Sequence, residues 1–142
     1  MALKIKKEQF KTVNYSQDEL VVIISINRPE AMNSFNAELR SELLLALKKA
    51  VLADDIRAII INGNGRNFSA GADLKDTNDA QKSLEEVLNN EYRPIFNLIS
   101  DINIPVIASV HGSAAGIGLS LALCCDLMLS LIHISEPTRR RG

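Results

Sequence analysis

Two short glycine-containing stretches carry the residues whose types and spacing suit chemistry. They are Phe68–Asp76 and His111–Gly118, and each follows an apolar run, Ala58–Ile61 or Val106–Val110, that predicts a buried strand. Each also opens a segment that we expect to be helical. Backbone N–H groups at such a strand-to-helix turn favour an anionic oxygen at the positive end of the helix. Two such turns lying together could aim two N–H donors at one oxygen, which is the geometry of an oxyanion hole.

Other chemistries fit these residues less well. Ser113 and Ser120 have no visible histidine–carboxylate pair, which argues against a serine hydrolase. His111 is a single histidine at a strand end, more typical of a turn hydrogen bond than of a base. The Gly116–Gly118 segment is an incomplete dinucleotide fingerprint that lies too late in the chain for a Rossmann fold. From spacing alone, two ordinary tight turns explain the pattern as well as an oxyanion hole does.

Composition predicts one globular domain without nucleic-acid or membrane partners. The chain has 142 residues, 46% of them hydrophobic, and a formal net charge of −1. Its longest apolar run, near residues 117–132, is broken by Asp126 and serines and so predicts core rather than a membrane span. Residues 1–10 alternate lysine with apolar residues, unlike a signal peptide. The adjacent Cys124 and Cys125 match no zinc site and suit buried reduced thiols, which favours the cytoplasm.

The elements that must position the two stretches alternate between strand and helix. We predict strands at residues 8–15, 20–26, 58–61 and 106–110. A turn at 16–19 should join the first two strands, and a further strand should start at 126–128. We predict helices from a cap at Ser34 or Asn36 to about Ala53, over 84–99 with a kink or restart at Pro94, and over 116–125. In the first helix, an apolar stripe that ends at Val51 should face the core and Arg40 should face water. The run 20–26 should be covered on both faces, and the last helix should be buried. Strands linked by helical crossovers pair in parallel, so the fold class is α/β.

Taken together, these signals resemble the N-terminal half of a crotonase-family protein, the enoyl-CoA hydratase/isomerase group. The matching segments are Asn27–Asn33, Phe68–Asp76 and Val110–Asp126, in the family's order and at roughly its spacing. The resemblance implies a crotonase-like (ClpP/crotonase) spiral of ββα units, truncated here before its C-terminal helices. Residues 1–128 are then expected to form the N-terminal part of an acyl-CoA-binding domain.

The resemblance also implies roles for particular residues. In the family, the thioester carbonyl of an acyl-CoA lies between two backbone N–H donors, which by position correspond here to Ala72 and Ile117. Cofactor-binding positions along the CoA moiety are implied at Ala70, Gly71, Ala72, Asp73, Leu74, Lys75 and, as a second cation for the phosphates, Arg28. A solvated surface charge explains Lys75 and Arg28 equally well, and Asp73 is expected to be a helix N-cap rather than a catalytic acid. No metal is implied and no separate cofactor, because coenzyme A is part of the thioester substrate.

Ser120 is the main departure from the family pattern. Enoyl-CoA hydratases carry a glutamate at the matching position, and an unaided serine hydroxyl is no general base near neutral pH. The resemblance therefore favours double-bond isomerisation over hydration, with the acid/base residue beyond the present end of the chain. The alternative is a non-catalytic acyl-CoA-binding protein or an inactive truncated fragment, and a hydrolase or decarboxylase of the family also stays open. The full-length relative is expected to be a homotrimer or hexamer.

Residues 129–142 break the pattern. In the family this point is mid-domain, whereas here the chain passes into a basic tail. The run Leu129–Arg139 resembles a one-frame translation of a common sequencing adapter. We therefore expect residues from about 129 onward to be non-native read-through, the alternative being a natural disordered basic end. Sequencing the parent gene past the codon for Met128 distinguishes the two.

Overall fold

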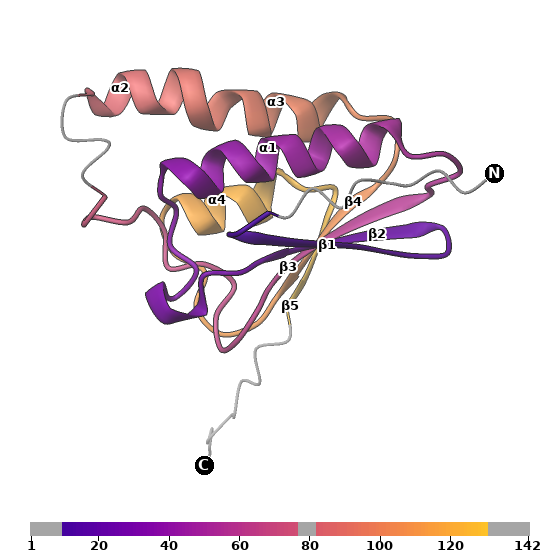
Figure 1. Cartoon of the computed structure of the whole chain (residues 1–142), viewed down its shortest axis with the longest axis horizontal. Helices are drawn as coiled ribbons and strands as arrows, with labels where there is room; N and C mark the ends of the chain where they lie inside the picture. The colour runs from indigo at the N-terminus through magenta and orange to yellow at the C-terminus, as the bar shows by residue number, and fades with distance from the viewer. Residues whose placement is uncertain (1–9, 77–81, 131–142) are drawn as a thin grey trace, which may run out of the picture.

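A five-stranded sheet with helices over one of its faces forms the fold (Figure 1). The computed structural model describes residues 10–76 and 82–130. The strands lie in sequence order across the sheet: β1 (Val13–Asp18), β2 (Val21–Ile26), β3 (Ala58–Gly63), β4 (Val106–Val110) and β5 (Leu127–Ser130). The helices are α1 (Ala37–Leu52), α2 (Leu84–Val87), α3 (Arg93–Asp101) and α4 (Ile117–Cys124). Strand β1 is antiparallel to β2, and β2 to β5 are parallel, which confirms the predicted parallel pairing.

The first hairpin is shifted from its predicted position. We predicted a strand at residues 8–15 and a turn at 16–19, but β1 continues to Asp18, which pairs with Val21. Residues 8 and 9 lie outside the described part of the chain. The polar residues of β1 face solvent and therefore look like a loop in the sequence, although the hydrogen-bonded register with β2 holds them in a strand. The strand is thus fixed by its partner rather than by its own composition.

Helix α1 forms where its amphipathic pattern predicts it, with two residues as exceptions. Of the two candidate caps, Asn36 is the N-cap, and its side chain accepts a hydrogen bond from Leu39 N at 2.9 Å. The apolar stripe packs on the sheet, except that Val51 is exposed. Arg40, which we predicted to face water, is 2% exposed. The predicted positions of Val51 and Arg40 are therefore both wrong.

The helical region around Pro94 restarts as predicted. A π-helical segment, η3 (Leu88–Tyr92), follows α2, and α3 then begins at Arg93 with Pro94 in its first turn. Proline is tolerated there because the first N–H groups of a helix have no intrahelical partner. The wider π turn accompanies the burial of Tyr92, which stacks against Phe96 and meets Phe35 edge-on.

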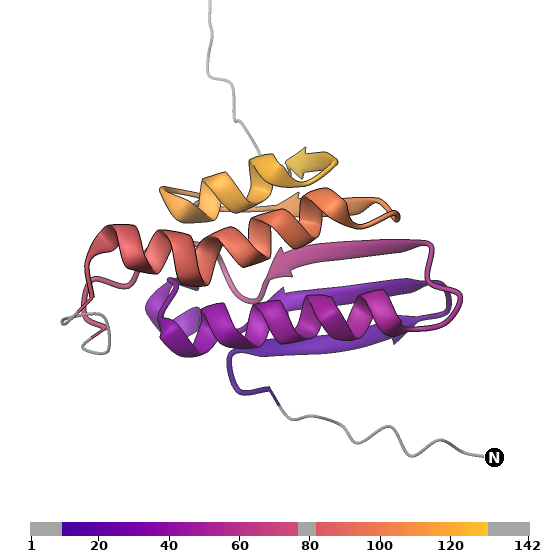
Figure 2. The same cartoon turned by 90° about the horizontal axis from the view of Figure 1, so that it is seen from above.

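The core lies between the helices and one face of the sheet. Figure 2 shows from above how the helices lie over the strands. Alternate residues of β2, β3 and β4 are buried on this face. The residues between them include Ile23, Ile60 and Ile107, which are neighbours in register and only half-buried. The prediction that residues 20–26 are covered on both faces is therefore wrong for Val21 and Ile23, because the described helices cover only the other face.

Helix α4 and β5 are more exposed than predicted. Only Gly118, Leu121 and Ala122 of α4 are buried, whereas Leu119 and Leu123 are 39% and 63% exposed. All of β5 is exposed, and it continues to Ser130, so it includes the first two residues of the unusual stretch 129–142. The rest of that stretch lies outside the described residues, and its non-native origin stays a prediction.

Candidate active site

The two glycine-containing stretches lie against each other beyond the carboxyl ends of β3 and β4. Ser69 and Ala114 form a parallel bridge, and Ala115 N donates to Ser69 O at 3.0 Å. Phe68 N donates to His111 O at 2.9 Å and to Ser113 O at 3.1 Å. The carboxyl edge of parallel strands is where open α/β sheets place their ligands. The structure therefore brings together the two stretches that the sequence singled out.

Glycine is required where the two turns touch. Gly71 has φ +104°, and a Cβ there would lie 3.0 Å from the carbonyl oxygen of Ala115. A Cβ on Gly118 would lie 2.7 Å from both Cβ and O of Ser69. Side chains at these positions would push the turns apart, so the close approach depends on glycine at both.

The backbone around Ala72 leaves its own N–H unpaired. Ala72 forms an isolated parallel bridge with Phe35, in which Phe35 N donates to Gly71 O at 2.7 Å and Asp73 N donates to Phe35 O at 2.8 Å. A parallel bridge uses the peptide groups on either side of the bridged residue. The N–H of Ala72 therefore points away from Phe35, and it donates no hydrogen bond to any other described residue.

The N–H of Ile117 is also unpaired within the described residues. Ile117 is the first residue of α4, where N–H groups have no intrahelical acceptor. The next N–H groups do find partners: Gly118 N donates to Ala115 O at 2.9 Å and Ser120 N donates to Gly116 O at 3.1 Å. Both N–H groups that the resemblance singled out are thus left available on adjoining turns.

Asp73 does not cap a helix, which corrects our prediction. Its carboxylate accepts hydrogen bonds from Lys75 N at 2.9 Å and from Arg28 Nη2 at 3.1 Å. The expected helix after the first stretch is absent at 73–76, where the bridge to Phe35 keeps the chain extended and a turn follows. The backbone N–H of Lys75, and then the Arg28 side chain, hold the pKa of Asp73 below its usual value against the opposing effect of burial.

Arg28 is engaged inside the protein. Besides Asp73, its guanidinium donates to the carbonyl oxygen of Ser34 and, at 3.3 Å, to the hydroxyl of Ser34. Arg28 therefore ties the Asn27–Asn33 motif to the first turn, and its 14% exposed side chain is directed to these partners. Contact with a phosphate by Arg28 stays a prediction, while Lys75 lies at the surface and keeps that role open.

Asn33, to which we assigned no role from the sequence, hydrogen-bonds to the loops that support the candidate site. Asn33 is completely buried, and its amide donates to Asn64 O at 2.8 Å and Asn67 O at 2.7 Å. Its Oδ1 accepts from Arg28 N at 2.8 Å. Asn67 in turn accepts from Ser113 N at 3.0 Å, in the second stretch. A signal was present, since Asn33 closes the motif that resembles the family and Arg28 belongs to the same motif, but Asn64 and Asn67 lie 31 and 34 positions further along the chain.

A pocket of about 460 Å³ opens beside the first turn. Its lining residues are Arg40, Ala72, Asp73, Leu74, Lys75, Asp76, Lys82, Leu84, Val87 and Tyr92. The buried Arg40 pairs with Glu91 (Nε–Oε1, 3.0 Å) and lies 5.2 Å from the Tyr92 ring centroid, while Lys82 reaches the other oxygen of Glu91 at 3.1 Å. The ion pairs thus hold α1, η3 and the segment before α2 together around the pocket.

We expect acid to weaken the fold through Glu91. Burial raises the pKa of Glu91, but hydrogen bonds from Lys82 and Arg40 outweigh it and leave that pKa below the usual value. A carboxyl whose pKa is lowered by folding stabilises the fold above its unfolded pKa, about 4, and that stability is lost as pH falls through the folded value. Urea unfolding at pH 7 and below pH 4 measures the free energy of unfolding at each pH. In Glu91→Gln, this free energy should fall less between the two pH values. An equal fall in unfolding free energy for Glu91→Gln and the unaltered chain would contradict the role given to Glu91.

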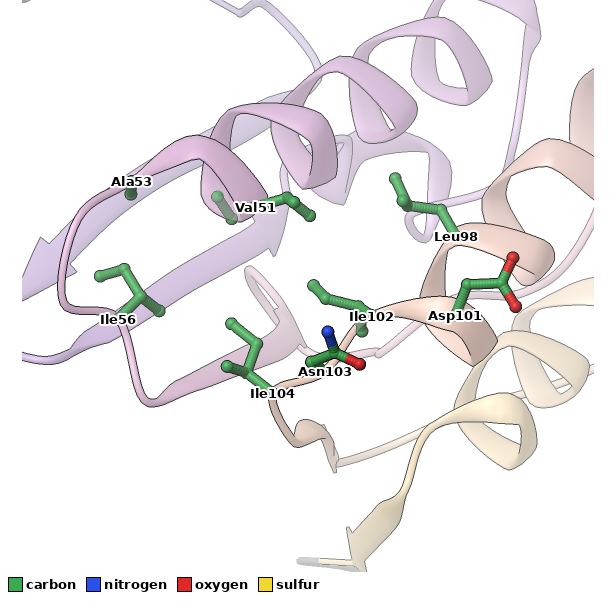
Figure 3. Close-up of a pocket in the computed structure, with 9 residues that line it drawn as sticks. Val51, Ala53, Ile56, Leu98, Asp101, Ile102, Asn103 and Ile104 are labelled. Atoms are coloured by element: carbon green, nitrogen blue, oxygen red, sulfur yellow. The ribbon is translucent and has the colours of Figure 1, made fainter.

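A second pocket, of about 290 Å³, lies at the opposite edge of the sheet (Figure 3). It is formed by the C-terminal ends of α1 and α3 and the loops that enter β3 and β4, with mainly apolar lining from residues such as Ile56, Leu98 and Ile104. Ligands of open α/β sheets bind at the carboxyl ends of the strands. This pocket lies at the amino ends and is not the candidate active site.

Comparison with known proteins identifies the family. The family model described as enoyl-CoA hydratase/isomerase matches residues 16–131. The chain is 40% identical over 121 residues to a protein of Rhodobacter capsulatus named "Probable enoyl-CoA hydratase", covering 85% of this chain and 46% of the relative. It is 37% identical over 118 residues to 1,2-epoxyphenylacetyl-CoA isomerase of Escherichia coli K12, covering 78% of this chain and 44% of the relative.

Solved structures give the same result for the fold. An enoyl-CoA hydratase from Shewanella pealeana superimposes with a TM-score of 0.79 at 26% identity, covering 86% of this chain and 47% of that one. The chain thus spans about half the length of the relatives it matches, and the predicted crotonase fold is confirmed. None of the helices within residues 10–76 and 82–130 combines the length and apolar character that a membrane crossing requires. By sequence and by fold, the chain belongs to the enoyl-CoA hydratase/isomerase family.

Proposed function

We propose that this chain supplies the thioester-binding turns of an acyl-CoA-transforming enzyme. The backbone N–H groups of Ala72 and Ile117 hydrogen-bond the thioester carbonyl and stabilise the enolate oxygen formed during reaction. The observation that carries the proposal is that both N–H groups are unpaired among the described residues and lie on turns in direct contact. Preorganised donors of this kind stabilise a developing negative charge without reorganising during the reaction.

We favour double-bond isomerisation over hydration. Ser120 is exposed on α4 and its hydroxyl donates to Gly116 O at 3.3 Å, so it offers no carboxylate to activate water. The similarity to 1,2-epoxyphenylacetyl-CoA isomerase is in line with this choice, although relatives named hydratases are equally similar. The acid/base residue of the reaction lies in the part of the full-length relative that this chain does not span.

The CoA moiety follows the segment from Ala70 to Lys75 in this proposal. Lys75 provides a surface cation for a phosphate, and Arg28 acts chiefly by fixing Asp73 and thereby the turn. Coenzyme A enters as part of the substrate and not as a separate cofactor. The full-length enzyme would be a homotrimer or hexamer, and the two free cysteines favour a reducing compartment such as the cytoplasm.

Ile117→Pro tests the proposal by removing one N–H donor. Proline is accepted at the first position of a helix, so α4 should be retained while the hydrogen bond to the thioester carbonyl is lost. One such bond is worth about 1 kcal/mol, so we expect acyl-CoA to bind about fivefold to tenfold more weakly by calorimetry.

Two controls make the result specific. Ile117→Ala keeps the N–H and should bind acyl-CoA with an affinity close to that of the unaltered chain. Free coenzyme A has no thioester carbonyl, so Ile117→Pro should leave its affinity unchanged. Equal weakening for coenzyme A and acyl-CoA would mean that the substitution disturbs the turn rather than removes a donor.

Acyl-CoA binding without turnover is the second candidate. It is favoured by the absence of a carboxylate at position 120. An acyl-CoA that raises the melting temperature with no shift of the double bond would support the binding protein. Loss of both effects would support an inactive fragment.

A further inference from the structure

The two thiols at the end of α4 have no part in the proposed function. Cys124 is the last residue of α4 and Cys125 follows it, at the opposite end of the helix from Ile117. They are the only cysteines in the chain. Both are free, but they are partly exposed rather than buried as we predicted, so a small reagent can reach them.

The two sulfur atoms lie close together. Cys124 Sγ is 3.0 Å and Cys125 Sγ is 3.4 Å from the same carbonyl oxygen, that of Leu121. Both sulfurs therefore lie within hydrogen-bonding reach of one oxygen atom. Interaction with the Cys125 side chain lowers the pKa of the Cys124 thiol and raises that of Cys125, so Cys124 is the more readily ionised of the two. The neighbouring carboxylate of Asp126 is directed elsewhere, since it accepts a hydrogen bond from Val106 N at 2.8 Å. The pair therefore offers two sulfur ligands and no third group from Asp126.

A direct disulfide between neighbouring cysteines is poorly accommodated. Consecutive Cα atoms are about 3.8 Å apart, whereas disulfides usually join Cα atoms about 4.4–6.8 Å apart. A single atom bonded to both sulfurs enlarges the ring and relieves this mismatch. Soft thiolate ligands also select soft, thiophilic centres over hard ones.

We infer that Cys124 and Cys125 together form a two-sulfur binding site for a soft trivalent arsenical. Phenylarsine oxide is the probe for this class. The arsenic forms one bond to each sulfur, its bond to oxygen breaks, and the two thiol protons leave with that oxygen as water. No oxidant or reductant is needed, because arsenic stays trivalent and both sulfurs keep their oxidation state.

Mass spectrometry of the full chain tests the inference. One equivalent of phenylarsine oxide should give one adduct that survives excess 2-mercaptoethanol and is removed by a small dithiol. Cys124→Ser and Cys125→Ser should each bind the probe at least tenfold more weakly, because one sulfur cannot form the ring. A single-serine variant that keeps a monothiol-resistant adduct would overturn the site, as would an unaltered chain that forms none.

Alkylation of the unaltered chain gives a second measurement that needs no variant. After one equivalent of the probe, iodoacetamide should modify neither Cys124 nor Cys125, whereas without the probe it should modify both. Protection of only one cysteine overturns the two-sulfur site. The test is independent of acyl-CoA binding, because the thiols and Ile117 occupy opposite ends of α4.

Discussion

Gly112→Ala is expected to lower the free energy of unfolding by about 3 kcal/mol and to abolish the contact between the two turns. Gly112 has φ +63°, a left-handed conformation that disfavours alanine, and a Cβ there would lie 1.9 Å from the carbonyl oxygen of Arg66. Both the loop before the first turn and the start of the second would have to shift. Urea unfolding measures the loss, and calorimetry with acyl-CoA measures whether the turns still form one site.

Gly65→Ala is the matched control. Gly65 is also left-handed, with φ +84°, but a Cβ there would lie 3.0 Å from the Pro29 side chain and touch no carbonyl group. We expect this variant to lose only the left-handed penalty, about 1 kcal/mol. If both alanine variants lose the same amount, the contact between Gly112 and Arg66 does not determine how the turns pack.

Arg40→Met should destabilise the fold by about 3 kcal/mol. The Arg40 side chain is 2% exposed and pairs with Glu91, so its removal leaves a partly buried carboxylate without its inner partner. Methionine keeps most of the apolar volume, which separates the lost charge from a lost packing contact. Urea unfolding at neutral pH gives the value, and the m-value should be unchanged if the native state stays compact.

Lys82→Met removes the other partner of the same carboxylate and serves as the comparison. The Lys82 side chain is 48% exposed, and an exposed ion pair contributes about 1 kcal/mol or less. Each variant removes one positive charge. The difference between their losses of unfolding free energy therefore reports the burial of Arg40 and not the number of charges removed. A loss for Lys82→Met as large as that for Arg40→Met would contradict the view that the buried arginine dominates the cluster.

Local sequence patterns predicted the positions of the strands and helices better than the burial of their side chains. Strand β4 matches its predicted range, and β3 and α1 differ by only one or two residues, because apolar periodicity and the Asn36 cap are encoded within each segment. Arg40 was assigned to the surface because it lies outside the apolar stripe of its helix. Its burial depends on Glu91, which lies 51 positions along the chain.

The candidate site was also predicted only where its features are encoded locally. The spacing of the two stretches predicted that they could meet, but only the family resemblance singled out Ala72 and Ile117 as donors. The non-helical backbone at Ala72 and Asp73 depends on hydrogen bonds to Phe35 that no local signal encodes. The half-exposed second face of the sheet was also missed, because an apolar run in a sequence does not say how many layers cover it.

The buried amide of Asn33 has a dynamic consequence. It holds the loop before the first turn and the Asn27–Asn33 motif, while Asn67 extends the connection to the second turn. A local fluctuation that frees one of these segments must break bonds shared with the others. Amide hydrogens across all three should therefore exchange with solvent deuterium in one cooperative opening rather than in three separate ones.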